Sequence, residues 1–438
     1  MDCPAFPLAL TALSFLVGLL APAISARYNL RIDRREPPGG PMLMQISETQ
    51  LDTITQLLGE GMRAGTAGDV RMAESCYDRC IAFDDGTEPT PEEAVALRPL
   101  WFAYVECAAL LESQGDYEGA IRRARRALVG QSTKAWALDR LAACYRALGR
   151  LAEAENACRE AIAATNPPVA WRYILLCGAI AGCDPSRIDE CREVLERAIG
   201  MDPNLEDAHY NLGILALKQD DLDSARLHLE RAIALAPDYA EAHCKLGVVF
   251  LRQNNLETAH FHLEKAVALD PKLGDAYGEL GQVLIRELYR DDQASDLGRV
   301  QACEDVLRKA IVLVPDDPVP ACYLVNLYWK CGRLRQAEEE GEGLIKRFPL
   351  SSVAHLLYGD FLASTDRGQK KAERLLKKAV ELGDEDAQAR FHYGKALLLW
   401  GRWQEAAAML RESDRLGEER AIPLLRSYVP HDDTSLDQ

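Results

Sequence analysis

The chain has 438 residues, 48% of them hydrophobic, and this composition excludes a protein that is disordered throughout. Its 51 Lys and Arg residues and 68 Asp and Glu residues give a formal net charge of −17. Such a charge opposes non-specific binding of nucleic acid, which depends on neutralising phosphates, and favours protein partners that carry basic patches.

The first predicted element is an apolar segment near the N-terminus. Residues 8–20 read LALTALSFLVGLL, and the sequence APAISA and several arginines follow them. This order is typical of a secretory signal peptide, although it would also suit a short membrane anchor. We therefore interpret residues 1–26 as a signal-peptide-like or anchor segment, with membrane association through residues 8–24. Residues 27–53 are interpreted as a linker and the start of the first helix.

A repeat follows the linker. Residues 208–213 read AHYNLG, and residues 242–247 read AHCKLG, 34 positions later. The echo continues downstream, where Ala225 recurs as Ala259. Within each period the apolar residues recur at helical spacing. A fixed period of this size is typical of arrays of paired helices.

The repeat also predicts where its helices end. With Gly213 as position 8 of a 34-residue unit, position 15 ends the first helix and requires a residue that adopts the left-handed conformation. Seven units place a suitable residue there: Gly68, Gly115, Gly149, Asp220, Asn254, Gly332 and Gly401. Positions 8, 20 and 27 carry small residues in the best units, which predicts close packing between helices. Proline at position 32 ends the second helix.

This pattern resembles the tetratricopeptide repeat (TPR) family. The resemblance implies an all-α fold, a right-handed superhelical solenoid of tandem helix-turn-helix units. It covers residues 54–420 in about ten units and is best over 204–271, with insertions near 181–187 and 287–299. Residues 421–438 are expected to form a C-terminal cap and an acidic tail.

The 13 cysteines fall largely on packing positions of the repeat, Cys191 and Cys303 at position 20 among them. We interpret them as small buried apolar residues rather than as disulfides or metal ligands. So many buried thiols favour a reducing, cytoplasmic compartment, whereas the N-terminal segment favours export or membrane association. Both localisations stay open at this point.

Motifs of catalysis do not occur in the sequence. A Walker loop, G-x-S-x-G, H-E-x-x-H and a dinucleotide fingerprint are all missing, and the segments outside the repeats are too short for a catalytic domain. Histidines recur one period apart, His209 with His243 and His228 with His262, as copies of one template would. We therefore predict no enzymatic activity, no cofactor, no metal site and no small-molecule substrate.

In the TPR family the first helices of successive units line a concave groove. The resemblance therefore assigns a peptide-binding groove to Tyr210, Asn211, Lys218, Lys245, Arg252, Gln282, Arg286, Asn326 and Lys330. Position 13 is basic in four consecutive units, at Lys218, Arg252, Arg286 and Lys330. Such a stripe would receive an acidic or extended segment of a protein partner. Alternatively, these cations only complement the dipole at a helix C-terminus.

We predict a non-enzymatic protein–protein interaction scaffold that binds peptide or protein segments in the groove and assists the assembly or localisation of a complex. One alternative is an RNA-binding helical-repeat protein, which the acidic charge and the TPR pattern oppose, so no nucleic-acid partner is expected. The other alternative is a regulatory or adaptor subunit that serves a catalytic partner.

Overall fold

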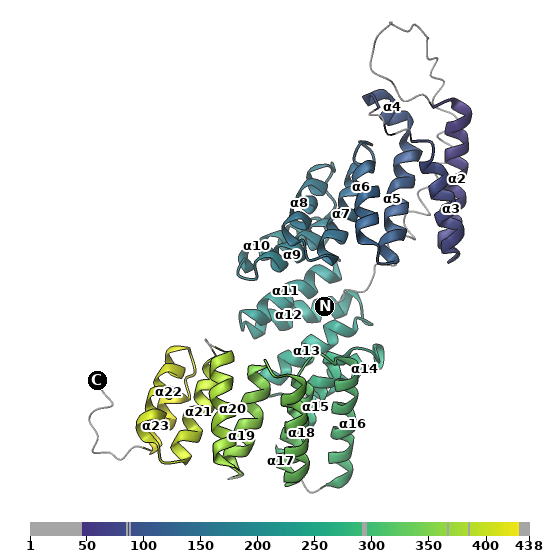
Figure 1. Ribbon diagram of the computed structural model, residues 1–438. Coiled ribbons are helices and arrows are strands. Elements are labelled where there is room, and N and C mark those ends of the chain that lie inside the picture. The colour runs from purple at the N-terminus through teal and green to yellow at the C-terminus, as the bar shows by residue number, and fades with distance from the viewer. Residues whose placement is uncertain are drawn as a thin grey trace. The chain divides into compact units, whose positions relative to one another are not determined.

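The computed structural model describes residues 46–84, 86, 89–290, 296–365, 368–383 and 386–428 (Figure 1). The regular elements in these ranges are all helices. No helix among them is long and apolar enough to cross a membrane. The predicted N-terminal apolar segment and the acidic tail beyond residue 428 lie outside the described residues.

The chain divides into two compact units, Met1–Pro203 and Asn204–Gln438. The first unit contains α2 (Glu48–Thr66), α3 (Val70–Ile81), α4 (Pro91–Ala96), α5 (Arg98–Ser113), α6 (Tyr117–Ala127), α7 (Lys134–Ala147), α8 (Leu151–Ala163), α9 (Ala170–Cys183) and α10 (Ile188–Met201).

The second unit contains α11 (Glu206–Lys218), α12 (Leu222–Leu235), α13 (Ala240–Arg252), α14 (Leu256–Leu269), α15 (Gly274–Arg290), α16 (Leu297–Leu313), α17 (Val319–Lys330), α18 (Leu334–Arg347), α19 (Ser352–Ser364), α20 (Gln369–Leu382), α21 (Ala387–Leu399), α22 (Trp403–Arg415) and α23 (Ala421–Tyr428).

Consecutive helices pack as pairs in both units. The closest contacts join α2 with α3, α5 with α6, α7 with α8, α9 with α10, and so on to α21 with α22 (Figure 1). Each second helix also contacts the first helix of the next pair within its unit. The predicted all-α array of tandem helical hairpins is therefore confirmed within each unit. The short helix α4 was not predicted.

The predicted helix ends are confirmed as well. All seven position-15 residues have positive φ angles, between 58° and 82°. After Asp220, the N–H of Asp221 donates to the carbonyl of Ala216 at 3.0 Å, which closes α11. The Asp221 side chain then accepts a hydrogen bond from the N–H of Ser224 and starts α12. Two adjacent residues thus end one helix and begin the next.

Close helix packing explains the small residues of the repeat. A Cβ atom added to Gly247 would lie 2.6 Å from Cγ of Leu263, on the second helix of the same pair. Ala225 and Ala232 on α12 are fully buried. Any larger side chain at these positions would push the paired helices apart.

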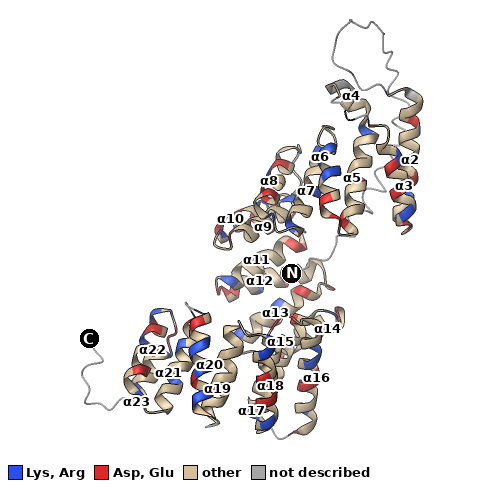
Figure 2. Cartoon of the chain, in the orientation of Figure 1, with Lys and Arg blue, Asp and Glu red and all other residues tan. Residues whose placement is uncertain are grey.

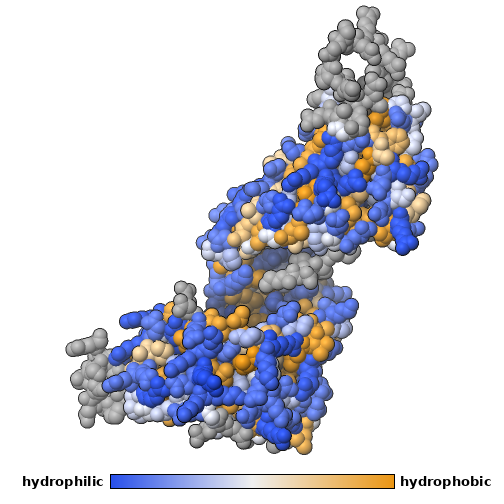
Figure 3. All heavy atoms as spheres, in the orientation of Figure 1, coloured by the Kyte–Doolittle hydropathy of each residue, from blue (hydrophilic) through white to orange (hydrophobic). Residues whose placement is uncertain are grey.

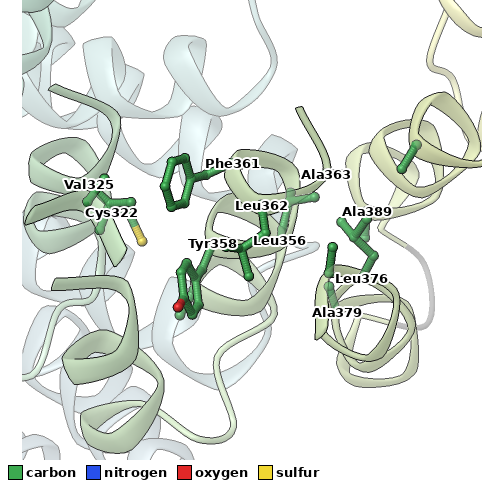
Figure 4. Close-up of a cluster of buried hydrophobic side chains, with 14 of the residues drawn as sticks. Cys322, Val325, Leu356, Tyr358, Phe361, Leu362, Ala363, Leu376, Ala379 and Ala389 are labelled. Carbon is green, nitrogen blue, oxygen red and sulfur yellow. The ribbon is translucent and has the colours of Figure 1, made fainter. Parts of the chain in front are cut away.

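Clusters of buried apolar side chains between the helices form the core of each unit. In the second unit, Cys322 of α17, Tyr358 and Phe361 of α19, and Leu376 of α20 belong to one buried cluster (Figure 4). On the face shown in Figure 3 the surface is largely hydrophilic, with apolar patches between polar ones. Charged residues of both signs are interspersed along α16, α18 and α20 (Figure 2).

The segment expected to carry an insertion near 287–299 lengthens two helices. Helices α15 and α16 each have 17 residues, whereas α11–α14 have 13 or 14. Residues 291–295 between them lie outside the described part. Near 181–187, α9 ends at Cys183 and α10 begins at Ile188, so a short loop separates this pair.

Candidate functional site

The first helices of the second unit form a continuous row. Helix α11 contacts α13, α13 contacts α15, α15 contacts α17, α17 contacts α19, and α19 contacts α21. Positions 6, 9 and 13 of each helix are three or four residues apart and therefore share one face. We call the surface that these positions form on α13, α15 and α17 the inner face. Its residues are Lys245, Val248, Arg252, Glu279, Gln282, Arg286, Tyr323, Asn326 and Lys330.

Two of the predicted basic residues are hydrogen-bonded to the preceding helix. Nη1 of Arg252 donates to the carbonyl of Leu217 at 3.1 Å and lies 3.2 Å from Oδ1 of Asp220. Nη1 of Arg286 donates to the carbonyl of Leu251 at 3.3 Å. Both carbonyls belong to position 12, in the last turn of the previous first helix. The arginines therefore complement a neighbour's helix C-terminus, rather than only their own.

The two lysines of the stripe differ from the arginines. Nζ of Lys330 lies 4.9 Å from the ring centroid of Trp329 and 5.7 Å from that of Tyr289, which is cation–π geometry. Lys218 is exposed at the end of α11 and has no hydrogen bond or ion pair to any described residue. The stripe is thus four cations in three different environments.

The centre of the inner face contains polar side chains without partners. Within the described residues, no hydrogen bond or ion pair involves the side chains of Lys245, Glu279, Gln282, Tyr323 or Asn326. Oδ1 of Asn326 is buried and accepts no hydrogen bond from the described residues. The buried hydroxyl of Tyr289 on α15 has no hydrogen-bond partner among them either. Burying an unpaired polar atom is costly, so Asn326 carries an energetic penalty in this arrangement.

Glu279 has a perturbed carboxyl group. Burial raises its pKa and outweighs the opposing charges of Lys245, Arg252 and Arg286, while the nearby Asp275 adds to the rise. Glu279 occupies position 6 on α15, the groove position that Lys245 occupies on α13. The sequence analysis missed Tyr289, because this residue follows the regular end of the first helix, where the repeat gives no register.

Two predicted groove residues are engaged in local structure. Nδ2 of Asn211 donates to the carbonyl of Asp207 in its own helix at 2.7 Å. The ring of Tyr210 lies 5.0 Å from that of Tyr239, whose hydroxyl donates to Oδ1 of Asp207 at 2.7 Å. The structure therefore does not bring Tyr210 and Asn211 into the set of unpartnered side chains, whereas it does bring Lys245, Gln282 and Asn326 there.

The row of first helices changes character after α17. The carboxylate of Asp360 on α19 lies 3.4 Å from Nζ of Lys395 and 3.2 Å from Nδ1 of His392, both on α21. Burial alone would raise the pKa of Asp360, but His392 and Lys395 outweigh it and hold the pKa below its usual value. Asp360 is thus contacted by side chains of α21, whereas the five inner-face side chains named above on α13, α15 and α17 have no hydrogen-bond or ion-pair partner among the described residues.

The sequence itself matches known repeat models. A family model described as tetratricopeptide repeat matches residues 186–240, 210–274 and 366–421, and a second model with the same description matches residues 137–166. The chain is a tetratricopeptide repeat protein. No curated protein sequence matches this TPR chain.

Solved structures with a similar fold include other TPR proteins. A tetratricopeptide repeat protein from Parabacteroides merdae is 16% identical and has a TM-score of 0.48, covering 59% of this chain and 97% of its own. Yeast Tom70 is 13% identical with a TM-score of 0.40, covering 86% and 96%. YrrB, described as a TPR protein with an unusual peptide-binding site, is 21% identical with a TM-score of 0.33, covering 45% and 96%.

The four histidines that recur with the repeat in this TPR protein pair between the two helices of one repeat, not between successive repeats. Nδ1 of His243 lies 3.0 Å from Nδ1 of His262, and Nδ1 of His209 lies 3.4 Å from Nδ1 of His228. Nε2 of His243 donates to the carbonyl of Pro237 at 3.2 Å, so its Nδ1 accepts from His262. The described residues contain no group of three or more His, Cys, Asp or Glu side chains that could hold a metal ion.

The cysteines of the described ranges are free thiols, buried except for Cys183 and Cys331, which are partly buried. Burial raises the pKa of the Cys303 and Cys322 thiols to about 12, which keeps them protonated at neutral pH. They contribute to packing, as Cys322 does in the cluster of Figure 4.

Proposed function

We propose that the inner face of α13, α15 and α17 binds an extended segment of a protein partner, so that this TPR protein acts as a non-enzymatic scaffold. The observation that carries the proposal is the concentration of unpartnered polar side chains there, including the partly exposed Lys245 and Gln282. An extended segment exposes backbone N–H and C=O groups. The amides of Gln282 and Asn326 could pair with both kinds of group.

The charge of the inner face supports an acidic partner segment. Lys245, Arg252, Arg286 and Lys330 outnumber Glu279 on this surface, although the whole chain is acidic. A local basic surface on an acidic protein would accelerate encounter with an acidic segment and orient it. We propose that such binding assists the assembly or localisation of a complex.

Site-specific photocrosslinking tests the proposal. A photoreactive phenylalanine analogue would replace Gln282 on the inner face, and Gln301 on α16 would be the matched control, because it is an exposed glutamine on the second helix of the same pair. The expected result is one partner segment, identified by mass spectrometry of the crosslinked peptide, that is captured from position 282 and not from position 301. Equal capture at both positions, or none at 282, would contradict the proposal.

A further inference from the structure

Arg252 and Arg286 hold their guanidinium groups in the same way. Within the described residues each donates hydrogen bonds only through Nη1, to a carbonyl at position 12 of the preceding first helix, and Nη1 of Arg252 also donates to Oδ1 of Asp220 at 3.2 Å. The Nε and Nη2 edge of each guanidinium has no acceptor there. This edge is one that arginine uses for bidentate binding of a carboxylate. The carbonyl contact fixes the side chain in advance, which lowers the entropic cost of binding a ligand.

The two arginines are separated by one repeat. They occupy position 13 of α13 and α15, two helices in direct contact. Packed helices have axes about 8–10 Å apart. An extended chain in the polyproline II conformation advances about 3.1 Å per residue with three residues per turn, so residues three positions apart share one face and lie about 9 Å apart, close to the spacing of one repeat. Side chains three residues apart on an extended segment would therefore meet successive arginines, provided that the segment crosses the helices.

We infer that Arg252 and Arg286 each bind a carboxylate side chain of an extended partner segment, and that these two acidic residues are three positions apart. Lys218 and Lys330 flank the pair at position 13 of α11 and α17 and extend the same register by one repeat on either side. The inference rests on the proposed function, because it specifies the segment that the inner face would bind.

Synthetic peptides test the spacing directly. Three fluorescent twelve-residue peptides with blocked ends would contain four residues of one charge in a Ser and Ala background. The first has Glu at every third position, the second has its four Glu residues adjacent, and the third has Lys at every third position. Fluorescence anisotropy with the full chain at low salt should show about tenfold tighter binding of the first peptide than of the second. The third should not bind.

A charge-conserving variant tests the two arginines. Arg252→Lys combined with Arg286→Lys keeps both positive charges but removes the planar fork, and we expect about a tenfold loss of affinity for the first peptide. Arg335→Lys on α18 is the control, because Arg335 is almost fully exposed and lies outside the inner face. This variant should bind the first peptide as tightly as the wild type does. Circular dichroism and thermal melting would verify that both variants are folded.

Each other outcome overturns a defined part of the argument. Equal affinity for spaced and adjacent Glu would overturn the register, and unchanged affinity in the double Lys variant would overturn the role of the arginines. Failure of every acidic peptide to bind, with crosslinking from position 282 intact, would overturn the inference and leave the proposed function standing. Failure to crosslink a partner segment from position 282 would contradict the proposed function itself.

Discussion

The guanidinium of Arg286 on α15 donates a hydrogen bond to the carbonyl oxygen of Leu251 on α13, 3.3 Å away. Arg252 makes the same contact with Leu217, one repeat earlier. Because stacked repeats gain stability from their nearest neighbours, these contacts join one first helix to the next along the row. The basic residues at position 13 are therefore part of the fold as well as candidates for ligand binding.

Replacing Arg286 by Met should loosen the end of α13. The variant keeps most of the aliphatic side chain but leaves the Leu251 carbonyl without this donor, and we expect a loss of about 0.5 kcal/mol because the contact is partly exposed. Hydrogen exchange should accelerate for the amides at the C-terminal end of α13. Lys330→Met is a suitable control, since Lys330 contacts aromatic rings rather than a carbonyl. Unchanged exchange in α13 would show that the contact has no role in stability.

Gly247→Leu should destabilise the second unit. The new side chain would begin 2.6 Å from Cγ of Leu263, so α13 and α14 would have to separate, at a cost of about 1–3 kcal/mol. Urea denaturation would measure the loss. Gly343→Ala in α18 is the matched control, because a Cβ atom there meets nothing within 4 Å. It should stabilise the protein slightly, since alanine favours a helix over glycine. A Gly247 variant as stable as the control would refute the packing argument.

Sequence periodicity predicted the ends of the first helices well, because a single residue with a positive φ angle is enough to end each helix. A positive φ at Asp220 or Gly332 follows from local backbone preferences, and the repeat frame locates it. The partners of Arg252 and Arg286 could not be predicted, because a backbone carbonyl acceptor leaves no mark in the sequence. The buried ion pair of Asp139 and Arg172 could not be predicted either, because the two residues are 33 positions apart and carry no common repeat signal.

Asp139→Ala should strongly destabilise the first unit. Asp139 and Arg172 are each 2% exposed, and their ion pair joins α7 to α9 with N–O distances of 2.8 to 3.1 Å. Removing the carboxylate leaves a buried guanidinium without its counter-ion, which costs about 3–5 kcal/mol. Thermal melting would record the loss.

A partly exposed ion pair provides the comparison for that variant. Glu112→Ala removes the partner of Arg140 and should change stability by less than about 1 kcal/mol. The double variant Asp139→Leu with Arg172→Met should recover most of the loss, because an apolar pair of similar volume replaces the charges. A small effect of Asp139→Ala alone would mean that the Arg172 charge finds another partner or reaches water.

Glu279→Gln should stabilise the second unit at high pH. Because burial raises the pKa of Glu279, its contribution to stability is complete at low pH and is lost as pH rises from about 4.3, its unfolded value, through the folded pKa. The neutral amide escapes this loss. The difference in unfolding free energy between variant and wild type should therefore grow between pH 4 and pH 8.

Ligand binding should change in the same variant. Glu279 interacts electrostatically with both Arg252 and Arg286, so its carboxylate competes with an acidic ligand. At pH 8 the spaced Glu peptide should bind Glu279→Gln more tightly than wild type, and near pH 4.5 the two affinities should converge. Weaker binding by the variant at pH 8 would indicate that Glu279 contacts a donor on the ligand instead.

The paired imidazoles of His243 and His262 should make the second unit sensitive to acid. Burial, with a smaller effect of the His243 charge, lowers the pKa of His262 to about 4, and burial also lowers the pKa of His243 despite the opposing effects of the Pro237 carbonyl and Asp238. Lys265 adds to the lowering at His243. Since both folded pKa values lie below about 6.5, the unfolded value, the pair stabilises the fold above pH 6.5 and loses that contribution as pH falls toward 4.

The loss should be about 1 kcal/mol once solvent screening of the partly exposed His262 ring is considered. Titration of the His262 ring proton by NMR should give a midpoint near pH 4, and urea unfolding should show stability falling between pH 6.5 and pH 4. His262→Phe preserves the ring packing against Phe250 but removes one of the two titrating groups, so it should make this part of the pH profile less steep. A His262 midpoint close to 6.5 in the folded protein would show that its Nδ1 contact with His243 does not exclude the second proton.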